Sequence, residues 1–307
     1  MDPRFLVIGE ALIDIVETAD GARAEHPGGS PANVALGLGR LGHRVELACA
    51  LGADARAERI AAHLAASGVG LGASLGAIAR TSTAHARLNA AGAADYAFDL
   101  EWRLDATAAP AADHIHTGSL AAQLAPGADA VLALLRARRD AASISFDPNI
   151  RPDLLADRAA ARARCEEIVA LADVVKASDE DLAHLYPGVP VDRALADWAG
   201  RGPVLAIATL GARGALACLP GGEPTALPAR PVAVADTVGA GDSFMAGLLS
   251  GLADAGLLGV GGGGLRRPAG ASAAGAFTAA LERATACAAL TVARAGADLP
   301  TRSQLPG

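Results

Sequence analysis

The amino-acid sequence predicts an α/β fold with a mainly parallel central sheet. Short apolar runs of strand length alternate with longer segments of helical pattern, which is the order of elements in a sheet covered by helices. Several of these runs end in glycine or polar residues, and ligands of open α/β sheets gather at such strand ends. A chain of 307 residues buries a large core, so we expect a single domain, 1–307, with at most a smaller excursion.

Composition argues against several classes of protein. The net charge is −7 and no large basic cluster is present, which argues against nucleic acid as a partner. Hydrophobic residues make up 52% of the chain, yet no apolar run approaches the ~18 residues of a membrane-spanning helix. The N-terminus carries no basic leader, and the cysteines form no Cys-x-x-Cys pair. We therefore expect a cytoplasmic protein with reduced thiols at Cys49, Cys165, Cys218 and Cys287.

The N-terminal part of the chain predicts strands over 5–8, 12–16 and 45–49. The segment Gly28-Gly29-Ser30-Pro31-Ala32-Asn33 leads into a helical pattern, with Ser30 suited to the N-cap and Pro31 to the first turn. A second helix is expected over 55–67.

The stretch 83–104 breaks this alternation of strands and helices. Its two alternating segments, 84–88 and 96–100, have the pattern of a β-hairpin with one apolar face. Together with the extended N-terminal piece they predict a small β-sheet that stands off the main domain. We interpret this sheet, formed by about 12–27 and 83–105, as a lid.

The C-terminal half continues the alternation of elements. Strands are expected over 143–146, 174–176 and 204–208, and helices over 165–172, from 178, over 244–249 and over 281–294. The segment 259–275 is rich in glycine and alanine and cannot bury much apolar surface. We therefore expect a flexible loop over 257–276.

His114 and His116 lie two residues apart on one face of another predicted strand. A metal site needs further ligands, and none is close in sequence. We expect these side chains to be solvated or hydrogen-bonded instead.

The segment Asp236-Thr237-Val238-Gly239-Ala240-Gly241-Asp242 carries the strongest functional signal. Its glycines let main-chain N–H groups approach a ligand, and the helix that follows adds unpaired donors, which suits a phosphate group. Asp242 is then placed to accept a proton from a substrate hydroxyl. A P-loop and a dinucleotide fingerprint are excluded, because Asp242 and Phe244 stand where lysine and glycine are needed. The alternative is an ordinary turn in which Asp242 caps the helix.

Other polar residues follow predicted strands. Asp14 interrupts an apolar run, so it either faces outward or accepts a sugar hydroxyl, and Asn33 offers both a donor and an acceptor to a polyol. The turn 209–214 is a second glycine turn suited to polyphosphate or ribose. Lys176 is the single lysine among 26 basic residues, which hints that this position requires an ammonium group.

Four segments in this order resemble the ribokinase-like (PfkB) carbohydrate kinases, especially the fructokinase branch: 28–33, 147–151, 209–214 and 236–242. The resemblance spans nearly the whole chain. It implies a three-layer αβα sandwich of the ribokinase-like type with a small β-sheet lid. It also implies ATP-dependent phosphorylation of a sugar hydroxymethyl group with Mg²⁺ and, in some members, a monovalent cation such as K⁺. In several members the lid also makes a homodimer.

The resemblance assigns roles to single residues. Asp242 is the base, and the amides of Gly239, Ala240 and Gly241 form the anion hole. The sugar is held by Asp14, Gly28, Gly29 and Asn33, and the nucleotide site contains Thr209, Gly211, Gly214, Lys176 and Ser178. Asp236 matches a position for the monovalent cation. The family's Asn-x-x-Glu appears here as 178–181, and Asp181 is one methylene shorter than glutamate, so its contact with Mg²⁺ is open to bridging by water.

Two alternatives remain at this point. Arg151 is suited to a carboxylate, which makes 2-keto-3-deoxygluconate the main rival of fructose, and Arg87 and Tyr96 of the hairpin would add to that reading. From another class, the chain would be a sugar- or nucleotide-binding protein without turnover. The intact Gly-Ala-Gly-Asp that contains Asp242 argues against this second alternative.

Overall fold

The computed structural model describes residues 2–18, 20–71, 77–88, 94–155, 157–259, 264–266 and 271–306. These residues form a nine-stranded sheet in the order β13-β12-β11-β10-β9-β8-β1-β4-β5. All neighbours from β11 to β5 are parallel, and β12 and β13 at one edge are antiparallel, so the predicted mainly parallel sheet is confirmed. The strands are β1 Phe5–Ile8, β4 Val45–Ala48, β5 Val69–Gly70, β8 His114–Gly118, β9 Ser143–Asp147, β10 Val174–Ser178, β11 Leu205–Thr209, β12 Ala215–Cys218 and β13 Thr225–Leu227.

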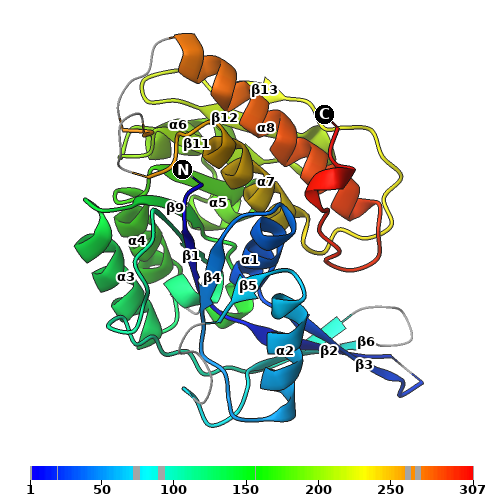
Figure 1. The fold of residues 1–307 in the computed structure, drawn as a ribbon. Helices are drawn as coiled ribbons and strands as arrows, with labels where there is room; N and C mark the ends of the chain where they lie inside the picture. Colours follow the sequence, from blue (N-terminus) through cyan, green and yellow to red (C-terminus); the bar gives the residue numbers. More distant parts are fainter. Residues whose placement is uncertain are drawn as a thin grey trace.

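Helices cover both faces of this sheet and complete three layers (Figure 1). Side chains alternate along each strand, so Val7 and Ile207 face one core while Ile8 and Phe146 face another. The first core lies under α1 Ser30–Arg40, α2 Ala55–Ala65, α7 Ala240–Asp254 and α8 Ala271–Val292. The second lies under α3 Gly127–Arg138, α4 Arg158–Val169, α5 Asp179–Leu185 and α6 Val191–Ala199. Short 3₁₀ turns are η1 Ser119–Ala122, η2 Pro152–Leu154, η3 Gly211–Arg213 and η4 Arg302–Gln304.

A second, four-stranded sheet projects from this body in the order β3-β2-β6-β7 (Figure 1). Its strands are β2 Leu12–Glu17, β3 Arg23–Gly28, β6 Thr83–Leu88 and β7 Ala94–Asp99. The predicted hairpin is present as the antiparallel pair of β6 and β7. Ile13 and Ile15 on one face of β2 are buried in the main core, so the small sheet is anchored to the body by its second strand.

Some boundaries differ from those predicted. Helix α4 begins at Arg158 because Asp157 caps it, accepting from the Ala160 N–H at 3.0 Å. Helix α8 begins ten residues before the predicted start, since its first turns contain alanines with high helix propensity.

The flexible loop predicted over 257–276 lies partly outside the described residues. Within the described part, Leu265 is buried and Arg266 pairs with the buried carboxylate of Asp173 at 2.7 Å. Residues 271–276 are helical and not loop. An arginine reaching a buried partner is a long-range contact that the glycine-rich composition of this segment does not reveal.

The two strand histidines are buried and hydrogen-bonded, as predicted. His114 contacts the hydroxyls of Ser143 and Ser145 at 2.8 Å each, and His116 contacts Ser145 at 2.9 Å. Burial lowers the pKa of each histidine to about 3, so both are neutral. In the part of the chain that is described, no group of three or more His, Cys, Asp or Glu side chains is arranged to hold a metal ion.

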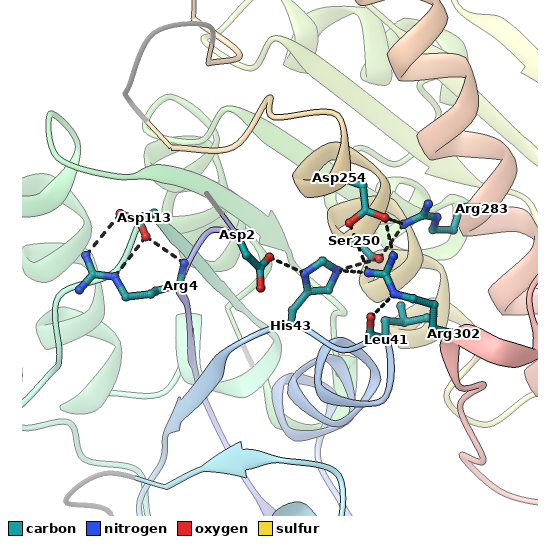
Figure 2. A network of polar contacts seen from close by, with 9 residues as sticks. All are labelled: Asp2, Arg4, Leu41, His43, Asp113, Ser250, Asp254, Arg283 and Arg302. Atoms are coloured by element: carbon teal, nitrogen blue, oxygen red, sulfur yellow. Dashed lines mark hydrogen bonds and ion pairs between the residues drawn. The ribbon is translucent and has the colours of Figure 1, made fainter.

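A polar network fastens the C-terminal segment to the ends of α1 and α7 (Figure 2). His43 contacts Asp2 through Nδ1 at 3.1 Å and Ser250 and Arg302 through Nε2 at 2.8 and 3.1 Å. Because a guanidinium only donates hydrogen bonds, Nε2 is the acceptor and Nδ1 carries the proton. Arg302 also pairs with Asp254 at 2.6 Å.

No helix among the described residues has the length and apolar character needed to cross a membrane. The four cysteines are buried, and no disulfide joins them.

Candidate active site

The N-termini of α1 and α7 pack together beside the ends of β9 and β10. Asp242 is the third residue of α7, and Asp147 and Lys176 come from the two strands. Carboxyl ends of parallel strands are where ligands of open α/β sheets bind. The fold therefore brings the central glycine motif to the expected place.

Asp242 is held on both of its oxygens by residues of α1. Ser30 Oγ donates to Oδ1 at 2.6 Å, and Asn33 Nδ2 donates to Oδ2 at 2.8 Å. Only 8% of Asp242 is exposed, and this burial raises the pKa of its carboxyl, against the effect of the two hydrogen bonds and of Lys176 and Arg151. The helix start also favours the ionised form.

The predicted Ser30 cap on α1 is wrong. The N-cap is Gly29, whose φ is 106°, and no side chain caps the helix. A Cβ at Gly29 would lie 2.5 Å from the carbonyl oxygen of Glu10, so the chain turns here in a conformation that requires glycine.

Main-chain donors gather at the start of α7. Gly239 is the N-cap in a left-handed conformation with φ of 75°. Ala240 N–H donates to Thr237 at 3.3 Å, while helix geometry leaves the N–H groups of Gly241 and Asp242 without an intrahelical acceptor. The apolar run 232–235 before this turn is exposed and is not a strand.

Lys176 and Asp147 form a buried ion pair beside this turn. Their Nζ and Oδ2 atoms are 2.8 Å apart, and a Cβ at Gly241 would lie 3.4 Å from Nζ. Burial alone would lower the pKa of Lys176, but the carboxylates of Asp147, Asp181 and Asp242 together outweigh it and the pKa is raised. Burial raises the pKa of Asp147 to about 6, so both groups are charged at neutral pH. Asp147 Oδ1 is buried without a hydrogen-bond partner among the described residues.

Asp14, on β2 of the small sheet, and Arg151 lie within electrostatic range of Asp242. Asp14 is paired with His26 across β2 and β3, and its carboxylate occupies the space that a side chain at Gly28 would need. Burial raises the pKa of Asp14 to about 6, and the charges of Arg151, His26 and Asp242 act on it. The predicted set Asp14, Gly28, Gly29, Asn33 and Arg151 is thus gathered around one region.

Glu10 is a member of this region that the motifs did not single out. It is buried, and its Oε2 accepts from Ala121 N–H at 3.1 Å. Burial raises the pKa of Glu10 to about 7, opposed by hydrogen bonds from Ser119 and Ala121 and by the charge of Arg151. The sequence signal that could have identified Glu10 is its position, directly after a predicted strand and Gly9.

The predicted nucleotide residues lie at the ends of β10 and β11. Thr209 ends β11, and Gly211 and Gly214 in the following turn have φ of 58° and 90°. A Cβ at Gly214 would collide with the Leu227 carbonyl, so this turn also requires glycine. Ser178, paired with Thr209 across the two strands, begins α5.

The two candidate cation ligands are occupied by main-chain donors. Asp181 forms a capping box with Ser178, and its oxygens accept from the N–H groups of Ile150 and Ser178 at 2.7 and 2.8 Å. Asp236 accepts from Val238 and Gly296 at 3.0 and 2.9 Å, and these bonds lower its pKa. Both carboxylates therefore fasten loops of the site in place.

A buried carboxylate, a helix N-terminus and a buried lysine thus meet at the carboxyl edge of a parallel sheet. A carboxylate beside main-chain N–H donors and a cation is an arrangement suited to transfer of a phosphoryl group to an alcohol. These features suit an α/β enzyme of the phosphotransferase class.

Comparison with known proteins gives the family. The model of the pfkB family carbohydrate kinases matches residues 2–304. A fructokinase of Klebsiella pneumoniae is 35% identical over 267 residues, covering 84% of this chain and 87% of that protein. A fructokinase of Rhizobium leguminosarum bv. trifolii is 35% identical over 262 residues, covering 81% and 79% of the two chains.

Solved structures agree with these relatives. Fructokinase from Vibrio cholerae O395, in a form with fructose, ADP and calcium ion bound, has a TM-score of 0.81 at 26% identity and covers 96% of this chain and 94% of its own. Aminoimidazole riboside kinase from Salmonella enterica, with aminoimidazole riboside and an ATP analog, has a TM-score of 0.80 at 26% identity and covers 98% of each chain. The chain belongs to the pfkB family of carbohydrate kinases, and the implied three-layer fold with a small second sheet is confirmed.

Proposed function

We propose that this carbohydrate kinase transfers the γ-phosphoryl group of ATP to a hydroxymethyl group of fructose. The observation that carries the proposal is the position of Asp242, between the N–H groups of α7 and the polar region around Asp14. Two findings support this choice of substrates. The chain is similar to fructokinases in sequence, and a similar solved structure, the fructokinase from Vibrio cholerae O395, has fructose and ADP bound.

In this proposal the sugar is oriented by Asp14 and Asn33. Asn33 uses its amide N–H on Asp242, which leaves its carbonyl oxygen as an acceptor for a sugar hydroxyl. Asp242 accepts the proton of the attacking hydroxyl as that oxygen forms its bond to phosphorus. Asp14 and Gly28 belong to the small sheet, so this sheet acts as a lid that completes the sugar site.

The phosphate groups would lie against the N-terminus of α7. Main-chain N–H groups at 239–241 stabilise negative charge on the group in transfer, and Lys176 adds a fixed positive charge beside them. Thr209, Gly211, Gly214 and Ser178 line the nucleotide side.

The site also fits a magnesium ion held mainly by phosphates and water, as is usual for Mg²⁺. Asp147 Oδ1 is a buried carboxylate oxygen without a protein partner among the described residues, and it is the group that would reach such an ion or its water. Bound Mg²⁺ would neutralise phosphate charge. Asp181 would act indirectly, by holding Ile150 and Ser178. Asp236, at the position that the resemblance assigns to a monovalent cation such as K⁺, would shape its loop through its bonds to Val238 and Gly296.

Charge around Arg151 favours a neutral sugar over 2-keto-3-deoxygluconate. Its guanidinium acts on three carboxyl groups, those of Glu10, Asp14 and Asp242. A sugar acid would bring a further carboxylate close to these three carboxyl groups, and this repulsion costs binding free energy.

The proposal extends to assembly and location. Strands β3 and β7 are the edge strands of the four-stranded sheet, and pairing of an edge strand with a second copy would give a homodimer. Four buried cysteine thiols fit the reducing cytoplasm. The net charge of −7 argues against a nucleic-acid partner.

A substrate panel tests the proposal. ADP release would be measured by a coupled assay with fructose, 2-keto-3-deoxygluconate and aminoimidazole riboside, with a reaction lacking sugar as the control. We expect the highest kcat/KM with fructose. ADP release that no sugar increases would contradict the kinase assignment, and a higher kcat/KM for either rival would replace fructose.

A further inference from the structure

The hydroxyl of Ser30 does not cap helix α1, although Ser30 lies at the start of that helix. Serine at the N-cap usually accepts a hydrogen bond from the first turn. In α1 the close approach to Glu10 places Gly29 at the N-cap, one residue earlier. Ser30 is therefore the first helical residue, and its hydroxyl points across to α7.

That hydroxyl makes a buried contact with Asp242. The Oγ–Oδ1 distance is 2.6 Å, and the two residues are 9% and 8% exposed. A hydrogen bond from an uncharged donor to a carboxylate is strong where water is excluded, and it stabilises the ionised form. Asn33 holds the other oxygen, so both donors come from one turn of α1.

Asp242 needs such support because burial acts against its charge. A base that is protonated at working pH cannot accept the proton of a sugar hydroxyl. We infer that Ser30 is a positioning residue that fixes Oδ1 of Asp242 and keeps this carboxylate ionised for proton transfer. The inference rests on the proposed role of Asp242 as base.

The test is the pH profile of kcat/KM for fructose in Ser30→Ala. A hydrogen bond to a charged group is strong enough to move a pKa by about one unit, so we expect the acid limb to move up by about one pH unit. Ser30→Thr keeps the hydroxyl and should keep the acid limb of the unaltered protein. Thermal unfolding of each variant shows that the fold is retained.

Ser243→Ala is the matched control. Ser243 is the next residue after Asp242 and is also buried, but its hydroxyl accepts from Thr291 at 2.8 Å. The same truncation there should leave the acid limb in place. In an Asp242→Asn background, Ser30→Ala should cause no further loss of turnover, because the group that it supports is absent.

Each outcome bears on one assignment. An acid limb that stays in place in Ser30→Ala, or that moves equally in Ser30→Thr or Ser243→Ala, overturns the role of Ser30. The proposed function fails separately, through absence of sugar-dependent ADP release in the unaltered protein.

Discussion

Lys176 Nζ lies 2.8 Å from Asp147 Oδ2, and both side chains are buried at the end of adjacent parallel strands. The pair stands where the N-terminus of α7 begins, next to Gly241. Its charges depend on one another, because a buried ion without its partner is costly.

Lys176→Met should therefore lower the free energy of unfolding by roughly 3–5 kcal/mol, since it leaves the Asp147 carboxylate buried and uncompensated. Lys176→Met combined with Asp147→Asn should regain much of this loss. The KM for ATP should be higher in both variants than in the unaltered protein, because neither variant has the cation beside the anion hole. Urea unfolding measures the loss of stability, and steady-state kinetics measure the KM for ATP. A Lys176→Met variant as stable as the unaltered protein would contradict the predicted loss of stability.

Asp181→Asn tests whether this residue is a cap or a metal ligand. An asparagine has one acceptor oxygen, so one of the two main-chain bonds is lost and stability should fall by about 1–2 kcal/mol. Ser178→Ala removes the other half of the capping box and is the comparison. We expect the Mg²⁺ concentration for half-maximal activity to be the same in Asp181→Asn and Ser178→Ala. A rise of roughly tenfold or more in Asp181→Asn alone would instead make Asp181 a metal-holding group.

Glu10→Gln should change how stability depends on pH. Burial raises the pKa of Glu10 from 4.5 to about 7, so between these values the folded state binds the proton more tightly than the unfolded chain. Stability contributed by Glu10 is therefore lost as pH rises through this window. Removing the charge should stabilise the variant relative to the unaltered protein at pH 8 by roughly 3 kcal/mol, and less at pH 5. Glu46→Gln, at an exposed site on β4, should show no such trend in thermal unfolding.

For His43 we expect the opposite trend to that of Glu10, with stability lost as the pH falls. Burial lowers its pKa below 6.5, so on acidification the unfolded chain takes up the proton first and stability falls below this pH. A proton on Nε2 would also face the Arg302 guanidinium (Figure 2). His43→Gln should flatten this loss of thermal stability between pH 6.5 and pH 5. An unchanged slope in the variant would assign the acid sensitivity to other groups.

Sequence patterns predicted the alternation of strands and helices because apolar periodicity is a local property. They also located the motif at Gly239–Asp242 and the lone Lys176. They did not predict that Lys176 pairs with Asp147, because that contact follows from parallel pairing of β9 with β10, which aligns Val175 with Phe146.

Local sequence patterns also could not predict that the Ser30 hydroxyl points toward Asp242. Ser30 has the residue type and neighbours of a helix cap, and only the approach of Gly29 to the Glu10 carbonyl moves the cap by one residue. The start of α8 and the anchoring of Arg266 on Asp173 depend in the same way on contacts far apart in sequence.

Turnover of Asp242→Asn with fructose and ATP is the most direct measurement of the central claim. Asparagine preserves the size of the side chain and removes its capacity to accept the proton. We predict a loss of kcat of roughly 10²–10⁴-fold with the fold retained. A variant that keeps near-native kcat would show that Asp242 is not the base and would contradict the mechanism.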